Sequence, residues 1–143
     1  MDDAGWLRIA CELAGLCPPS GTAFSVGAVI VGADGREISR GHSREHDPHE
    51  HAEESALAKT AADLTGTTIY SSLEPCGERR SRPLTCSELI LRAGIARVVF
   101  AWREPSLFVE GKGVEQLRAA GVEVMELPAL ADLARAQNAH LLS

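Results

Sequence analysis

Two short motifs and one later cysteine contain the residues of this sequence that could carry chemistry. His51 and Glu53 are separated by a single alanine, Cys76 follows a proline, and Cys86 comes after nine further residues. Zinc prefers imidazole and thiolate ligands, and a catalytic zinc keeps three protein ligands with water in the fourth position. The histidine and the two cysteines are therefore candidate ligands of one catalytic Zn²⁺.

Glu53 follows the candidate histidine ligand closely enough to reach a metal-bound water without being a ligand itself. Zinc lowers the pKa of a bound water from about 15.7 to about 7, which makes hydroxide available at neutral pH. Such a hydroxide can attack an sp² carbon that bears an amino group, and a nearby carboxylate must then carry the proton to the departing ammonia. A purely structural zinc needs four protein ligands, and His42, His46 or His49 could supply the fourth, so this alternative stays open here.

Hydrophobic periodicity and chain-breaking residues indicate alternating helices and strands. Residues 25–31 form an almost continuous β-branched run typical of a buried strand, and Gly94 and Gly121 follow segments with helical periodicity. The expected helices span residues 4–16, 51–63, 83–93, 113–120 and 128–142, and the expected strands span residues 25–31, 36–41, 67–72, 97–102 and 122–126.

These elements place the candidate ligands and determine part of the sheet. His51 begins one expected helix, Cys86 lies in the first turn of the next, and Cys76 lies in the loop before it. Helix N-termini favour the thiolate form of cysteine. A helix separates the strands at 97–102 and 122–126, the fourth and fifth of the chain, so these two should be parallel, because parallel neighbours need a crossover. We expect a five-stranded mixed sheet covered by helices.

Length and composition exclude several classes of protein. The chain has 143 residues, which predicts a single domain over 1–143. A net charge of −6 and an aromatic content of 4% argue against a nucleic-acid partner. No apolar run approaches the ~20 residues of a membrane span, and the acidic start MDDAGW is unlike a signal peptide. We therefore expect a cytoplasmic protein with no membrane partner.

The pattern His-x-Glu, Pro-Cys and a further Cys is the signature of zinc-dependent nucleobase deaminases. Over nearly its full length the chain resembles the cytidine-deaminase-like superfamily, and within it most resembles the pyrimidine deaminase of riboflavin biosynthesis. The matching stretches are 27–31, 41–42, 48–53, 72–76 and 93–99. The resemblance implies a three-layer α/β/α fold, one Zn²⁺ bound by His51, Cys76 and Cys86, and a proton shuttle at Glu53. It also implies a homodimer or a larger homo-oligomer.

Two substrate classes stay open. Arg82 falls where the riboflavin enzymes place a basic residue, four positions before the second cysteine, and such a residue could clamp a phosphate. The stretch 24–28 looks more like a cytidine deaminase, which makes Phe24 a candidate pocket residue. His42 and Trp102 are two further candidate substrate contacts.

The sequence therefore predicts a hydrolytic deaminase. We expect it to convert a ring amino group of a pyrimidine-type nucleobase, nucleoside or nucleotide to a carbonyl, with release of ammonia. One alternative is the aminopyrimidine phosphate of the riboflavin pathway specifically, and another is an inactive, zinc-stabilised binding subunit. Because a pure scaffold needs no proton carrier, the presence of Glu53 favours an enzyme.

Overall fold

A five-stranded sheet forms the centre of the fold, with the strand order β2-β1-β3-β4-β5. The computed structural model describes residues 1–77, 83–103 and 113–142. β1 is antiparallel to β2 and β3, whereas β3, β4 and β5 are parallel, so the predicted parallel pairing of the fourth and fifth strands is confirmed. The strands are β1 (Gly27–Val31), β2 (Glu37–His42), β3 (Thr68–Leu73), β4 (Arg97–Trp102) and β5 (Glu123–Glu126).

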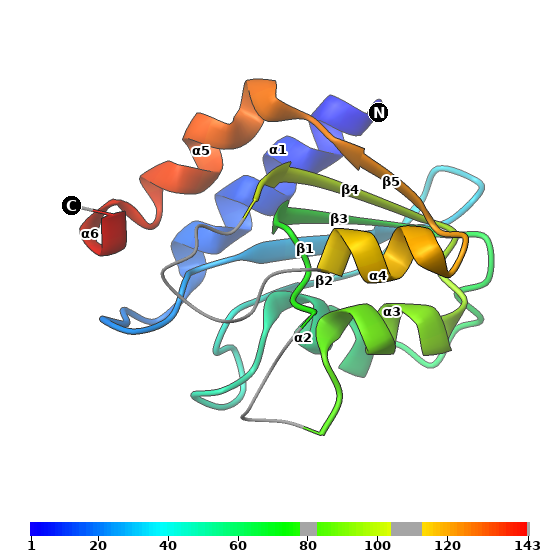
Figure 1. Ribbon diagram of the computed structural model, residues 1–143, viewed down its shortest axis with the longest axis horizontal. Helices are drawn as coiled ribbons and strands as arrows, with labels where there is room; N and C mark the ends of the chain where they lie inside the picture. The colour runs from blue at the N-terminus through cyan, green and yellow to red at the C-terminus, as the bar shows by residue number, and fades with distance from the viewer. Residues whose placement is uncertain (78–82, 104–112, 143) are drawn as a thin grey trace.

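Helices cover both faces of this sheet, which confirms the three-layer α/β/α architecture. α1 and α5 lie on one face, and α2 and α3 lie on the other (Figure 1). The helices are α1 (Asp3–Leu13), α2 (Ala52–Ala58), α3 (Cys86–Ala93), α4 (Gly113–Ala119), α5 (Ala131–Ala136) and α6 (Ala139–Leu142). Within the described residues no helix is long and apolar enough to cross a membrane.

The core lies between the sheet and its helices and follows from the hydrophobic pattern. All five residues of β1 are buried, as expected for a continuous apolar run covered on both faces. On α1 the stripe formed by Leu7, Ala10 and Leu13 is buried against the sheet. The one-in-three spacing of these side chains puts them on one helix face.

One edge of the sheet collects the ends of several strands. His42 at the end of β2 pairs with Gly27 at the start of β1, and Leu73 at the end of β3 pairs with Trp102 at the end of β4. The loops that leave these strands therefore begin at a common edge. We call this edge the carboxyl edge, and functional loops gather at such an edge in open α/β sheets.

Two of the expected helices are shorter than predicted. The helix expected over 51–63 ends at Ala58, because beyond it the side chains of Thr60 and Asp63 accept the N–H groups of the residues two positions later. Such local side-chain hydrogen bonds compete with helical ones. The helix expected over 83–93 begins only at Cys86.

The expected final helix, 128–142, is wrong as a continuous element. It is divided into a 3₁₀ turn (Pro128–Leu130), α5 and α6. The break falls at Gln137 and Asn138. The Asn138 side chain is buried and bonds to the backbone of Ser25, a distant contact that helical periodicity does not reveal.

Candidate active site

The three predicted metal ligands meet beyond the carboxyl edge of the sheet. Each of His51, Cys76 and Cys86 offers one ligand atom, and these three atoms lie within 4.8 Å of one another. His51 Nδ1 lies 3.2 Å from Cys86 Sγ. The backbone N–H of Cys86 donates to Cys76 Sγ at 3.2 Å. His42, His46 and His49 do not join the group. The described residues therefore do not supply the fourth protein ligand that a structural zinc needs.

Two helix starts hold two of these ligands in place. His51 is the N-cap residue of α2, and its backbone N–H donates to Glu54 Oε1 at 3.1 Å. Cys86 is the first residue of α3, which Thr85 caps by accepting the Glu88 N–H at 3.2 Å. Because capping fixes where a helix begins, it also fixes the direction in which the first side chains point.

The loop that carries Cys76 is held by the start of α3. The backbone carbonyl of Cys76 accepts hydrogen bonds from Ser87, from its N–H at 3.1 Å and from its hydroxyl at 2.9 Å. Two successive residues of α3, Cys86 and Ser87, therefore fix the sulfur and the carbonyl of the same cysteine.

The start of α4 supports the same loop from another side. Glu74 Oε2 accepts the Val114 N–H at 3.1 Å, and Gln116 Nε2 donates to the Gly77 carbonyl at 2.8 Å. A Cβ atom at Gly113 would lie 1.7 Å from the Pro75 carbonyl oxygen, so only glycine permits this approach. The position of Glu74 beside the metal loop suggests a carboxylate that organises this loop, but the sequence gives no sign that Gly113 and Gln116 contact it.

The chemistry of the three donors fits a zinc ion. A hydrogen bond from the Cys86 thiol lowers the pKa of Cys76, and although burial opposes this, further hydrogen bonds bring the value to about 5. The hydrogen bond to Cys76, with burial, raises the pKa of Cys86. A second thiolate at this position therefore needs a cation beside it, and two thiolates with one imidazole match the preference of Zn²⁺.

Glu53 lies beside the ligands and away from water. It is the second residue of α2 and only 3% exposed, and burial raises the pKa of its carboxyl group. Ser71 Oγ on β3 lies 2.9 Å from Glu53 Oε1 and 2.7 Å from the Leu73 carbonyl oxygen. One hydroxyl hydrogen can serve only one of these acceptors at a time, so Ser71 can donate to an ionised Glu53 or accept from a protonated one.

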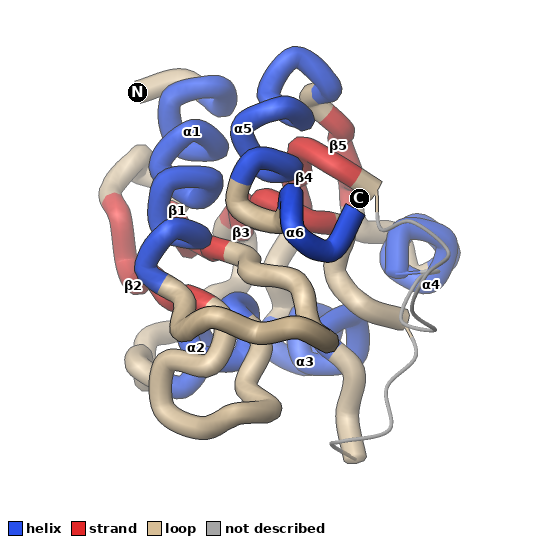
Figure 2. The backbone as a smooth tube through the Cα atoms, turned by 90° about the vertical axis from the view of Figure 1, so that its left-hand side faces the viewer, coloured by secondary structure: helices blue, strands red, loops and turns tan. Residues whose placement is uncertain are grey.

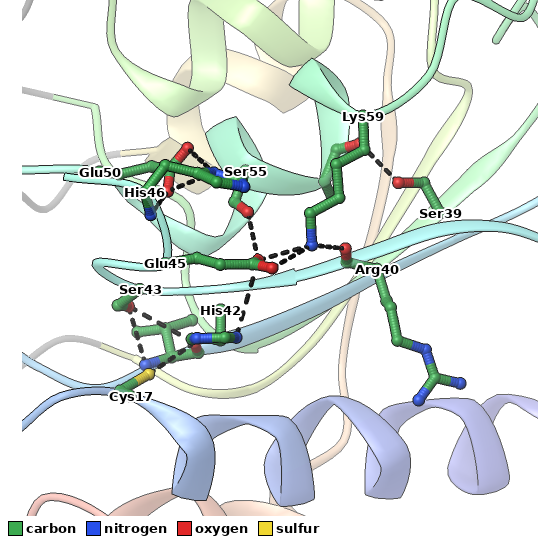
Figure 3. A network of polar contacts seen from close by, with 12 residues as sticks. Cys17, Ser39, Arg40, His42, Ser43, Glu45, His46, Glu50, Ser55 and Lys59 are labelled. Carbon is green, nitrogen blue, oxygen red and sulfur yellow. Dashed lines mark hydrogen bonds and ion pairs between the residues drawn. The ribbon is translucent and has the colours of Figure 1, made fainter.

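The residues predicted to contact substrate have different surroundings. Phe24 and Trp102 contact each other edge to face, with ring centroids 5.4 Å apart, and both are buried. His42 Nδ1 faces Glu45 Oε1 at 3.6 Å, within a polar network that includes Lys59 (Figure 3). Burial is the main cause that lowers the pKa of His42. Arg82 lies outside the described residues.

Comparison with known proteins identifies similar chains. The zinc-binding region of cytidine and deoxycytidylate deaminases matches residues 1–102. The diaminohydroxyphosphoribosylamino-pyrimidine deaminase of Schizosaccharomyces pombe is 41% identical over 115 residues, which cover 77% of this chain and 28% of that protein. RibD of Acinetobacter baumannii superposes with a TM-score of 0.82 at 36% identity, covering 98% of this chain and 39% of the other. Rib2 deaminase of Aspergillus oryzae in complex with DARIPP gives a TM-score of 0.80 at 28% identity, covering 98% and 96%.

This chain thus spans less than half of the yeast relative and of the bacterial RibD, and 96% of the Aspergillus deaminase chain, which is a C-terminal deletion mutant. The family match covers more than half of the chain and includes all three candidate ligands, His51, Cys76 and Cys86. The chain belongs to the zinc-binding family of cytidine and deoxycytidylate deaminases.

Proposed function

We propose that this protein is a zinc-dependent hydrolytic deaminase whose substrate is a diaminohydroxyphosphoribosylamino-pyrimidine. The reaction replaces the C–NH₂ group of the ring with C=O by addition of water and loss of ammonia. The observation that carries the proposal is the buried carboxyl group of Glu53, held by Ser71 beside the group formed by His51, Cys76 and Cys86. A binding scaffold would need the three ligands but no carboxylate at this position.

The chain's own residues divide the work between holding and proton transfer. His51, Cys76 and Cys86 would hold Zn²⁺, which when bound activates water near neutral pH. Glu53 accepts a proton from the attacking water and passes it to the ring nitrogen as the C–O bond forms. It then takes the proton of the new hydroxyl group and delivers it to the departing amino group, so that C=O forms as ammonia leaves. Ser71 can bond to both protonation states of Glu53, so the carboxyl group stays in place throughout.

The substrate class is supported by the relatives. The name of the yeast relative specifies a diaminohydroxyphosphoribosylamino-pyrimidine, and the Aspergillus deaminase is described in complex with DARIPP. The similarity to a cyanophage deoxycytidylate deaminase has only 21% identity and supports the fold alone. Among the two substrate classes left open by the sequence, these relatives favour the riboflavin-pathway compound. We keep Arg82 as the proposed phosphate contact.

A homo-oligomer and a cytoplasmic location complete the proposal. Neither location nor oligomeric state changes the chemistry assigned to Glu53, which lies within one chain. Multi-angle light scattering of the zinc-loaded protein measures the mass directly. A dimer or larger species is expected, and a monomer at micromolar concentration would contradict this part of the proposal.

The experiment that tests the function is ammonia release by the zinc-loaded protein from a panel of amino-heterocycles. The panel holds the aminopyrimidine phosphate, its dephosphorylated form, deoxycytidylate, cytidine and guanine. We expect the aminopyrimidine phosphate to have the highest kcat/KM, and its dephosphorylated form to react more slowly. A preference for deoxycytidylate or cytidine would overturn the substrate assignment, and no release from any compound would overturn the activity.

A further inference from the structure

We propose that Asn138 and Arg44 are positioning residues that set the shape of one wall of the substrate site. This inference rests on the proposed deaminase function. The wall is the irregular segment between α1 and β1, residues 18–26, which we call the 18–26 segment. It contains no helix or strand, so its backbone polar groups need partners elsewhere. Figure 2 shows that α6, which follows Asn138, lies at the surface of the molecule next to the chain end.

The side chain of Asn138 bonds to both backbone polar groups of Ser25, near the end of the 18–26 segment. Its Oδ1 accepts the Ser25 N–H at 2.6 Å, and its Nδ2 donates to the Ser25 carbonyl at 3.0 Å. Nδ2 also donates to the Ala134 carbonyl at 3.2 Å, which ties the contact to the end of α5. Asn138 is only 1% exposed, so an apolar replacement would leave the Ser25 backbone groups without partners and without water.

Arg44 holds the same segment from the loop that leads to the metal ligands. Its guanidinium donates to the Pro18 carbonyl at 2.8 Å and 3.1 Å, to the Phe24 carbonyl at 3.1 Å and to Ser25 Oγ at 2.8 Å. Its own backbone N–H donates to the Glu50 carbonyl, directly before His51. Arg44 has a φ of 58°, a conformation that L-residues with long side chains adopt at a cost. The four hydrogen bonds of the Arg44 guanidinium offset that cost.

The 18–26 segment reaches the site through Phe24. Its ring contacts the ring of Trp102 at the end of β4, and the Trp102 carbonyl accepts the Glu74 N–H at 2.8 Å. Glu74 is two residues from Cys76. At the next residues, the Gly27 N–H donates to Ser72 Oγ, one residue from the serine that faces Glu53. A shift of the segment therefore moves Phe24 relative to the Trp102 ring, whereas the ligands and Glu53 are carried by α2, α3 and the loop before α3.

Steady-state kinetics separates this role from general support of the fold. In Asn138→Leu, which keeps the branched shape of the side chain but removes both hydrogen-bonding groups, we expect KM to rise about tenfold with kcat within about twofold and zinc content unchanged. Arg44→Lys keeps the charge but loses the fork, and we expect the same pattern with a smaller rise in KM. Gln137→Ala, at an exposed neighbouring position, is the matched control and should behave like the parent protein.

A KM unchanged within twofold in both variants would overturn the proposal. So would a joint loss of kcat and zinc, because that pattern means that the whole site depends on these residues for folding. In the double variant the two effects should be less than additive, since both residues hold one segment. Fully additive effects would mean that they act on separate parts of the site.

Tryptophan fluorescence tests the same inference without measuring ammonia release. The chain has two tryptophans, so Trp6→Phe leaves Trp102 as the sole indole. In this background we expect Asn138→Leu to shift the emission of Trp102 to longer wavelength, because Phe24 leaves the indole and water reaches it. An unchanged emission spectrum would contradict the wall's dependence on Asn138. If the parent protein releases no ammonia yet the shift occurs, the proposed function fails while the positioning role stands.

Discussion

The two halves of this site are built differently. The metal-ligand half takes His51, Cys76 and Cys86 from helix starts and one loop, and each ligand is fixed by residues within a few positions of another ligand. The half that we propose as the substrate wall takes Phe24 from an irregular segment, and its partners Arg44 and Asn138 lie 20 and 113 positions away from the residues they hold.

The difference shows how local and distant contacts divide the functions of one site. Ligand geometry must be precise for the metal to bind, and capping boxes supply that precision from short sequence motifs. The proposed wall is held instead by hydrogen bonds between residues far apart in the sequence. The comparison predicts that changes in the first half affect zinc and kcat, whereas changes in the second affect KM.

The largest effect, a loss of both zinc and turnover, is expected from removing a ligand. Cys86→Ser should lose zinc and reduce turnover by more than about a hundredfold, because the serine hydroxyl is a poor replacement for a buried thiolate. Metal analysis after gel filtration and ammonia release measure the two losses. Cys17→Ser, at a half-buried cysteine outside the ligand group, is the control and should keep both. A fully zinc-loaded, active Cys86→Ser protein would remove that residue from the ligand set.

Gly113→Ala tests the support of the ligand loop from α4. The added methyl group would overlap the Pro75 carbonyl, and we expect the free energy of unfolding to fall by about 1–3 kcal/mol, as in other overpacked sites. Urea denaturation measures the change. Gly21→Ala is the matched control, because no atom lies within 4 Å of a Cβ placed there. Equal stability of the two variants would mean that the close approach of Gly113 on α4 to the Pro75 carbonyl does not contribute to stability.

Two neighbouring serines of β3 offer the sharpest contrast between the halves. Ser71 faces Glu53, whereas Ser72 accepts the Gly27 N–H next to the 18–26 segment. We expect Ser71→Ala to lower kcat about tenfold and Ser72→Ala to raise KM by a smaller factor, in keeping with the free energy of one hydrogen bond each. Steady-state kinetics on both variants checks this. The opposite assignment of the two effects would break the comparison.

The smallest effect is expected at the opposite edge of the sheet, far from both halves. The hydrogen bond from Arg97 is the main cause that lowers the pKa of Asp3 from its ordinary value of 3.8. Because the folded pKa is the lower one, the pair contributes its full stability above about pH 4 and loses it as the pH falls through the folded value. Asp3→Asn should cost ~0.5–1 kcal/mol of unfolding free energy at pH 7 and little near pH 2, with kcat and KM unchanged.

Denaturation of Asp3→Asn at the two pH values measures this difference. Asp132→Asn is the control, because Asp132 pairs with Arg135 while 94% exposed and should contribute almost nothing at either pH. A stability loss that is equal at pH 7 and pH 2 would exclude the ion pair as its cause.

Sequence analysis predicts the metal-ligand half well and the wall poorly, for the same physical reason. His51 and Glu53 lie at the start of one helix and Cys86 at the start of the next, so locating the two helix starts in the sequence also locates these residues. The parallel pairing of β4 and β5 follows from the helix between them, and the structure confirms it. These inferences need only neighbouring residues.

The wall depends on contacts that no local pattern contains. The apolar periodicity of residues 128–142 predicts one helix, but the side chain of Asn138 bonds to Ser25 and the helix breaks there. Phe24 and Trp102 are singled out by the sequence as separate substrate contacts, whereas in the structure each ring covers the other. Their contact with substrate stays a prediction.

The most direct test of the central claim is a joint measurement of bound zinc and ammonia release for the parent protein and Glu53→Gln. Glutamine keeps the size of the side chain but cannot shuttle a proton. With the aminopyrimidine phosphate as substrate, we predict one zinc per chain in both proteins and a fall in turnover of about a thousandfold in the variant. Equal turnover with equal zinc would show that Glu53 does not transfer the proton, and would contradict the mechanism proposed for this site.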